Sequence, residues 1–193
     1  TLTGFKWISR AADPDGSLMF GYEEALGFCV GEQVHDKDGI TAAVLFAEVV
    51  AVQAAHGRTV FDVLADLSRR HGVHQTGQWS MRLDGGDAMS AMVALMAGLR
   101  ADPPSELAGR PVRTVIDLIE GDPGRGLPAS DVVILRLEGA RVVVRPSGTE
   151  PKLKCYLEVV EPVAEGADLA VARASAAAAL DELTDAIRSV VAG

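Results

Sequence analysis

The chain has 193 residues, 48% of them apolar, and carries a formal net charge of −9 at pH 7. This length suits one large or two small domains, and the apolar share is typical of a globular protein with a core. The acidic balance argues against a nucleic-acid partner, because nucleic-acid phosphates would be repelled. The longest apolar runs are too short and too interrupted for a membrane span.

Residues 1–73 are predicted to form the end of a βα-type α/β domain. Short strands are expected over residues 5–8 and 18–22, separated by a turn-rich segment. The absence of an initiator Met, with a strand at once, suggests that the chain is the C-terminal part of a longer polypeptide. No basic segment followed by an apolar one opens the chain, as a secretory signal would require.

Two helices are expected next. Asp38 is typical of an N-cap for a helix over residues 39–56, whose alanine- and valine-rich sequence is apolar on most faces and should be largely buried. Thr59 is expected to cap a second helix that reaches about residue 71, where Gly72 ends it.

Residues 74–193 are predicted to form a complete small α+β domain. Residues 73–83 look extended, with Gly77 weakening the middle. A helix over residues 88–99 should place Met89, Met92 and Met96 in the core.

After the Asp102-Pro-Pro-Ser105 breaker, the sequence predicts a mostly antiparallel four-stranded sheet with helices on one side. The strands are expected over residues 113–118, 132–137, 140–144 and 153–160, with a tight turn at Glu138-Gly139. The final helix, over residues 167–191, has Val171, Leu180, Leu183 and Ile187 as its larger apolar contacts.

Cys29 and Cys155 each sit inside an apolar stretch of a different segment. Buried free thiols in a reducing compartment are the expectation, which indicates a cytoplasmic protein.

The most informative segment is Arg145-Pro-Ser-Gly-Thr-Glu-Pro-Lys152, between two strand-like runs. Arginine can hold two oxygens of a phosphate. Ser147 and Thr149 add hydroxyl donors, and Gly148 lets its backbone N–H approach a ligand. These residue types fit a phosphate-monoester site, although they are also typical of an ordinary polar hairpin turn.

The full string resembles the phosphate-binding loop in the last domain of the α-D-phosphohexomutases, the phosphoglucomutase and phosphomannomutase superfamily. A second segment, Glu23-Glu24-Ala-Leu-Gly27, resembles the sugar-binding loop of the same superfamily. Carboxylates are good acceptors for sugar hydroxyls, but alone this segment would fit a solvated acidic turn. Asp36-Lys37-Asp38-Gly39 and a helical run follow it, as they do in the family.

The second segment departs from the family pattern at Ala25, where many members have a serine that shares the sugar hydroxyls. The local sequence looks closer to the phosphopentomutase-like branch, so the identity of the sugar is left open. The resemblance also places Lys37 near the transferring phosphate, where it could stabilise charge or donate a proton. A solvated lysine near a helix N-terminus is the alternative.

The resemblance implies a phosphosugar mutase, an isomerase that moves a phosphoryl group between sugar hydroxyls through a bisphosphate intermediate. Glu23 and Glu24 would bind the sugar, and Arg145, Ser147, Gly148, Thr149 and Lys152 would bind the non-transferring phosphate. The family's catalytic serine loop and its aspartate-rich metal loop do not occur in this sequence. Phosphoserine and Mg²⁺ would therefore belong to N-terminal domains outside this chain, and the chain holds no metal site of its own.

Two other functions stay open. The chain could be a phospho-ligand-binding module without catalysis, or a structural α+β domain with a polar hairpin.

Overall fold

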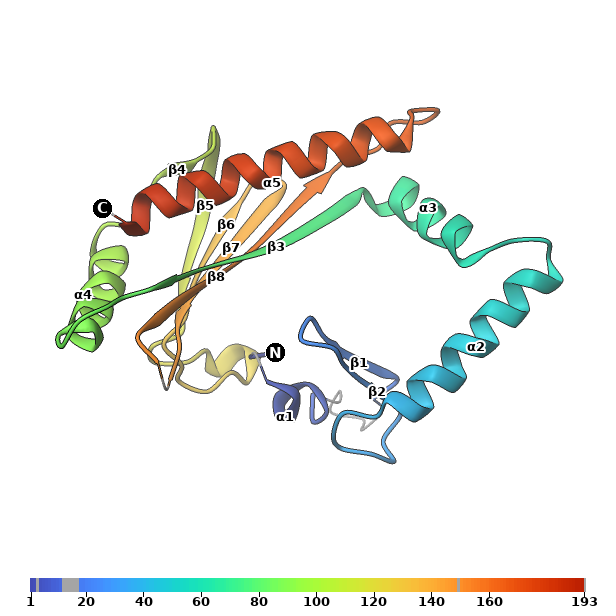
Figure 1. Cartoon of the computed structure of the whole chain (residues 1–193), viewed down its shortest axis with the longest axis horizontal. Helices are drawn as coiled ribbons and strands as arrows, with labels where there is room; N and C mark the ends of the chain where they lie inside the picture. Colours follow the sequence, from blue (N-terminus) through green and yellow to red (C-terminus); the bar gives the residue numbers. More distant parts are fainter. Residues whose placement is uncertain (3, 12–17, 149, 193) are drawn as a thin grey trace. The chain divides into compact units, whose positions relative to one another are not determined.

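The structure is a computed structural model that describes residues 1–2, 4–11, 18–148 and 150–192 (Figure 1). The chain divides into two compact units, Thr1–Leu64 and Ala65–Gly193, and each is described by itself. Within the described residues, no single helix is long and apolar enough to cross a membrane, although two consecutive helices would pass that test together as a pair bent by 91°.

The first unit contains a β-hairpin of β1 (Phe20–Glu23) and β2 (Gly27–Val30), which pair antiparallel. Gly21 lies opposite the buried Cys29. A Cβ at Gly21 would lie only 2.5 Å from the Cys29 sulfur, so this position tolerates no side chain without a shift. The hairpin corresponds to the strand that the sequence predicted, with a second strand added.

The segment Phe5–Ile8 is helix α1, and the prediction of a strand there is wrong. Phe5 is buried, and its carbonyl oxygen accepts a hydrogen bond from the N–H of Ser9 at 2.8 Å. A four-residue apolar run has no periodicity that distinguishes a helical turn from a strand, so its surroundings decide.

Helix α2 (Gly39–Ala55) begins at Asp38, as predicted. The Asp38 carboxylate accepts hydrogen bonds from the N–H groups of Ile40 and Thr41, at 3.0 and 3.3 Å, and from the Thr41 hydroxyl at 2.6 Å. The Thr41 hydroxyl is the main cause that lowers the pKa of Asp38. These bonds satisfy N–H groups that have no partner inside the helix.

The prediction that α2 is largely buried is wrong in this structure, because none of its residues is buried. Ile40 is 80% exposed and Phe46 is 59% exposed. Valine and alanine around most of the helix predict burial only if neighbours cover several faces. The described residues of this unit do not supply that cover.

Helix α3 (Val60–His71) begins after Thr59, as predicted, and the boundary between the two units falls inside it. The Asp62 carboxylate accepts from the N–H and hydroxyl of Thr59, both at 2.8 Å, while the Thr59 hydroxyl accepts from the N–H of Asp62. These bonds lower the pKa of Asp62, the backbone bond most. Gly72 follows the helix with a φ of 89°, which favours glycine.

The second unit is built on an antiparallel sheet of six strands in the order β3-β8-β7-β6-β5-β4. The strands are β3 (Val73–Arg82), β4 (Glu106–Leu107), β5 (Arg110–Asp117), β6 (Val133–Leu137), β7 (Ala140–Pro146) and β8 (Lys152–Glu161). The four predicted strands are present. The predicted count is too low because the extended segment 73–82 pairs with β8 along its whole length, and because the two-residue β4 pairs with β5.

Helices α4 (Ala88–Ala101) and α5 (Leu169–Ala192) contribute to a core on one face of this sheet (Figure 1). From the helices, the core contains Met92, Met96, Leu99, Leu180, Leu183, Ile187 and Val191. From the sheet it contains the alternating residues Leu153, Cys155, Leu157 and Val159 of β8. The predicted core residues Met89 and Val171 are exposed instead, because they lie on the outer sides of their helices.

Two further predictions, one on a turn of this unit and one on the cysteines of both units, are confirmed. Gly139, with a φ of 64°, makes the tight turn between β6 and β7. Both cysteines are free and buried, and burial raises the pKa of the Cys155 thiol to about 12. Gly77 in the middle of β3 has a packing role, because a Cβ there would lie 3.0 Å from the Leu180 side chain.

Candidate functional site

The residues that the sequence singles out fall in two places. One is the β1–β2 hairpin with the start of α2, in the first unit. The other is the connection between β7 and β8, in the second unit.

In the hairpin, the structure brings together two candidates from separate segments. The Lys37 ammonium lies 2.7 Å from the Glu23 carboxylate, and the side chains are 45% and 13% exposed, respectively. Glu23 is the last residue of β1 and Lys37 lies just before α2, so strand and helix ends converge here. Because Glu23 is mostly shielded, its carboxylate is a fixed acceptor with a cation already at one oxygen.

The geometry also explains the glycine of the Glu-Glu-x-x-Gly segment. A Cβ at Gly27 would lie 2.7 Å from the Phe5 ring and 2.9 Å from Cε of Lys37. The Lys37 ammonium lies 5.9 Å from the centroid of the Phe5 ring and contacts the Ala25 carbonyl at 3.5 Å. Gly27 therefore provides the space in which Lys37 reaches Glu23.

The tip of the hairpin is open to solvent. Glu24, Ala25 and Leu26 are exposed, and Leu26 has a φ of 57°, uncommon for a residue with a side chain. Glu24 therefore presents its carboxylate to solvent, where it can accept hydrogen bonds from a ligand.

His35 contacts Ser9 in both directions. Its Nδ1 lies 3.4 Å from the Ser9 carbonyl oxygen, and the buried Ser9 hydroxyl donates to the His35 carbonyl at 2.9 Å.

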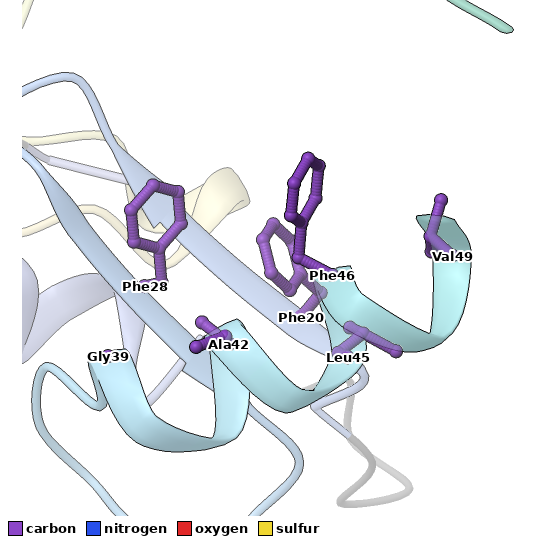
Figure 2. A pocket seen from close by; sticks show the side chains of 8 residues that line it. Phe20, Phe28, Gly39, Ala42, Leu45, Phe46 and Val49 are labelled. Carbon is purple, nitrogen blue, oxygen red and sulfur yellow. The ribbon is translucent and has the colours of Figure 1, made fainter. Parts of the chain in front are cut away.

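A hollow of about 570 Å³ lies beside the hairpin and is lined almost only by apolar side chains. The rings of Phe20 and Phe28 from the hairpin and of Phe46 from α2 border it (Figure 2). Neither Glu23 nor Lys37 lines it. Its chemistry suits an apolar surface of protein and not a sugar phosphate.

In the second unit, the β7–β8 connection is a closed turn. The N–H of Ser147 donates to the Lys152 carbonyl at 2.7 Å, and the N–H of Leu83 donates to the Pro151 carbonyl at 2.9 Å. A Cβ at Gly148 would meet no described atom within 4 Å, so a ligand can approach its backbone. Thr149 lies outside the described residues.

Arg145 lies opposite Lys154 in the β7–β8 register, and Lys152 begins β8. Within the described part of the chain, neither Arg145 nor Lys152 has a carboxylate within 4.0 Å. Arg100 differs: its guanidinium contacts Asp117 at 3.0 Å and also Asp131. Partial burial alone would lower the pKa of Arg100, but hydrogen bonds to Asp131 and Asp117 raise it. Arg100 is held by two carboxylates within the fold, whereas Arg145 and Lys152 have no carboxylate that close among the described residues.

The register also reveals a residue that the sequence did not single out. Arg82, the last residue of β3, lies directly opposite Lys152. The sequence does not show which residues of two strands face each other when they are 70 residues apart. The only signal for Arg82 in the sequence was a cation at the end of an extended segment. Across the described residues, no three His, Cys, Asp or Glu side chains gather as a metal site would require.

Both regions that contain the candidate residues match models of known protein families. Residues 1–71 match the family model for the phosphoglucomutase/phosphomannomutase alpha/beta/alpha domain III, and residues 112–176 match that for the C-terminal domain. The chain therefore belongs to the phosphoglucomutase/phosphomannomutase family, as the resemblance indicated.

Individual relatives point the same way. The chain is 41% identical over 160 residues to a probable phosphomannomutase of Haemophilus influenzae, covering 82% of this chain and 30% of the relative. It is 29% identical over 173 residues to a phosphoglucomutase of Staphylococcus aureus, covering 83% and 31%. The chain thus spans about a third of the length of the curated relatives it matches.

A solved structure shares the fold. Parafusin, a phosphoglucomutase from Paramecium in its open form, aligns with a TM-score of 0.65 at 18% identity, over 100% of this chain and 34% of that one.

Proposed function

We propose that this chain is the sugar- and phosphate-binding part of a phosphosugar mutase, acting with further domains that carry the chemistry. Family membership supports the class of reaction, which moves a phosphoryl group between hydroxyls of one sugar phosphate. A phosphosugar substrate accounts for both candidate places, because one offers carboxylate acceptors and the other offers cations and an open backbone at Gly148.

The main observation behind the proposal concerns the turn between β7 and β8, whose cations have no acidic partner among the described residues. In a chain of net charge −9, Arg145 and Lys152 lack an acidic partner among the described residues, and Gly148 leaves its backbone open. Such a group of donors recognises phosphate without contacting the rest of the sugar. It would therefore hold whichever phosphate is not reacting, in both orientations of a bisphosphate intermediate.

Glu23 is proposed to accept hydrogen bonds from sugar hydroxyls, with Glu24 beside it. The ion pair with Lys37 at 2.7 Å supports a fixed position for the Glu23 carboxylate. Lys37 would lie near the transferring phosphate, and its 45% exposure leaves the ammonium accessible to a ligand oxygen. Because Ala25 supplies no hydroxyl, the two carboxylates would carry the sugar contacts of this turn.

Other parts of the proposal concern what surrounds the chain. The exposed apolar faces of α2 and the hollow beside it support a partner polypeptide, proposed as the N-terminal domains of the same protein. Phosphoserine and Mg²⁺ would be held there, because the family's serine loop and metal loop do not occur in this sequence. The division of domains near residues 73 and 74 and the cytoplasmic location stay predictions.

The proposal is tested by binding and by turnover. The chain should bind a hexose 6-phosphate weakly and the free hexose not at all. In the intact protein, Arg145→Ala should cost roughly 1.5–3 kcal/mol of phosphosugar binding, because a charge-assisted bidentate partner is lost. An unchanged affinity would contradict the assignment of the turn.

A coupled mutase assay separates binding from chemistry. The 193-residue chain, supplied with magnesium and a sugar bisphosphate, should show no interconversion of 1- and 6-phosphates, because it lacks the serine nucleophile. Turnover above background would mean that the reacting groups lie among the residues assigned to binding.

A further inference from the structure

The side of the sheet in the second unit that faces away from α5 carries a block of four cations at one end. On β8, Lys152 and Lys154 alternate with the buried Leu153 and Cys155, so both lysines lie on the side away from the core. Arg82 of β3 lies opposite Lys152, and Arg145 of β7 lies opposite Lys154. Directly opposed residues of antiparallel strands share a face.

The block is compact. Cβ atoms of opposed residues lie about 4.5–5.5 Å apart, and diagonal neighbours lie about 7–8 Å apart. Four flexible or forked side chains from three adjacent strands can therefore reach a single anion the size of a phosphate. Arg82 approaches it from the side opposite Arg145, across β8.

This arrangement is unfavourable without a ligand. Like charges directly opposite each other destabilise a sheet, and this block contains two such pairs side by side. Across the described residues, none of the four cations has a carboxylate within 4.0 Å. The chain has 27 Asp and Glu residues, yet none of those that the structure describes is placed to neutralise the block.

The other end of the same face shows the compensated alternative. Glu158 on β8 receives Arg141 of β7 at 3.0 Å and His74 of β3 at 3.1 Å. The same three strands therefore place a carboxylate between an arginine and a histidine at one end, and only lysine and arginine side chains at the other.

We propose that Arg82 is a phosphate-binding residue that completes the anion site at the base of the β7–β8 turn. The inference rests on the phosphate site proposed above and adds a residue from a different strand and a different part of the sequence. Arg82 and Arg145 hold the anion from opposite sides of β8, with the two lysines between them. The ligand class is a phosphate dianion.

The test is a titration of the ¹⁵N-labelled 193-residue chain with inorganic phosphate, at pH 7.5 and constant ionic strength. The amide signals of Ser147 and Gly148 report binding at the turn. Arg82→Gln should raise the Kd roughly 3- to 10-fold, and Arg145→Gln should raise it more, because each removes a charge-assisted contact at a partly exposed site. Arg82→Lys should give a smaller loss than Arg82→Gln, because it keeps the charge but not the fork.

Arg136→Gln is the matched control. Arg136 is exposed and lies opposite Arg141. Its replacement by Gln changes the net charge by the same amount as Arg82→Gln. Arg141 is four residues from Arg145 along β7, roughly 13 Å at about 3.3 Å per residue. Arg136→Gln should therefore change the Kd less than twofold. An equal effect of Arg136→Gln and Arg82→Gln would show a general field effect and overturn the assignment of Arg82.

The remaining outcomes are distinguishable. Loss of affinity in Arg145→Gln with none in Arg82→Gln would overturn this inference and leave the proposed function standing. No response of the turn in the unsubstituted chain would overturn the phosphate site itself. Thermal melting checks the fold: Arg82→Gln should melt at the same or a higher temperature, because it removes a like-charge pair. Weaker binding together with undiminished stability is the signature of a binding residue.

Discussion

Helices α2 and α5 have similar apolar, alanine-rich sequences but opposite surroundings. In α5, a stripe of residues including Leu180, Leu183 and Ile187 is buried against the sheet of its own unit. In α2 no residue is buried, and Phe46 is 59% exposed. Apolar content therefore indicates that a helix needs cover but does not say which part of a polypeptide supplies it.

The difference extends to the two units as a whole. The second unit has a six-stranded sheet and a large hydrophobic core with a smaller second cluster, which supports stability of its own. The first has a two-stranded sheet, although it matches a family model described as alpha/beta/alpha. The candidate phosphate turn thus stands on a self-sufficient scaffold, while the candidate sugar turn stands on one that leaves apolar surface open.

The largest expected effect tests the difference in burial between α2 and α5. Leu183→Ala should destabilise the second unit by about 2–5 kcal/mol, because it leaves a cavity in a fully buried site. Phe46→Ala should change the stability of the chain by less than about 0.5 kcal/mol, since an exposed side chain loses little on truncation. Urea denaturation measures both effects, with Trp79 fluorescence reporting the second unit in a Trp7→Phe background and Trp7 fluorescence reporting the first unit in a Trp79→Phe background.

If Phe46→Ala proved as costly as Leu183→Ala, α2 would be covered in solution, and the contrast between the helices would fail. Val171→Ala is a control within α5, because Val171 is 67% exposed. It should behave like the α2 variant and not like its own helix.

The next effect concerns close packing in the first unit. Gly27→Ala should cost about 1–3 kcal/mol, because its Cβ would overlap the Phe5 ring at 2.7 Å and Lys37 at 2.9 Å. Gly148→Ala has no such neighbour among the described residues and should leave stability nearly unchanged. Hydrogen exchange of the β1 and β2 amides measures the first effect, and thermal melting the second. Equal tolerance at both glycines would contradict the tight contact at the hairpin.

Much of the fold follows from sequence signals of short range. Asp38 and Thr59 mark the starts of α2 and α3 because their side chains bond N–H groups within three residues. Pairing over long range was not visible, so β3 was predicted as extended but not as a strand of the sheet. The strand prediction for Phe5–Ile8 was wrong for a different reason, because four residues are too few to show whether apolar side chains repeat with a helical or a strand period.

The candidate site divides in the same way. Glu23, Lys37 and Arg145 were recognisable from short motifs, but the ion pair of the first two depends on how the hairpin meets the start of α2. Arg82 could not be linked to the turn because only the β3–β8 register places it opposite Lys152. The need for Gly27 became clear only from the atoms that approach it.

A smaller effect tests whether the ion pair of the first unit is fixed. A double-mutant cycle of Glu23→Gln and Lys37→Met should give a coupling energy of about 0.2–1 kcal/mol, since Lys37 is 45% exposed and solvent weakens the pair. The cycle for Arg113 and Glu138, whose side chains are 63% and 74% exposed, is the comparison in the second unit and should give less. Zero coupling at Glu23 and Lys37 would remove the argument that Glu23 is held in position.

The smallest effect is the pH dependence of the α2 start. Hydrogen bonds, chiefly from the Thr41 hydroxyl, lower the pKa of Asp38 below its usual value in the folded chain. A carboxyl with a lowered folded pKa binds fewer protons in the folded than in the unfolded state, so it stabilises the fold above the unfolded pKa of about 3.9. That contribution is lost as the pH falls through the lower folded pKa. Asp38→Asn should therefore flatten the loss of α2 helicity as the pH falls below about 3.9, while an Asp168→Asn control at the start of α5 should leave that profile as it is. Backbone carbonyl chemical shifts of α2 across the titration measure the effect. An unchanged acid transition in Asp38→Asn would mean that other carboxylates govern the stability of this helix.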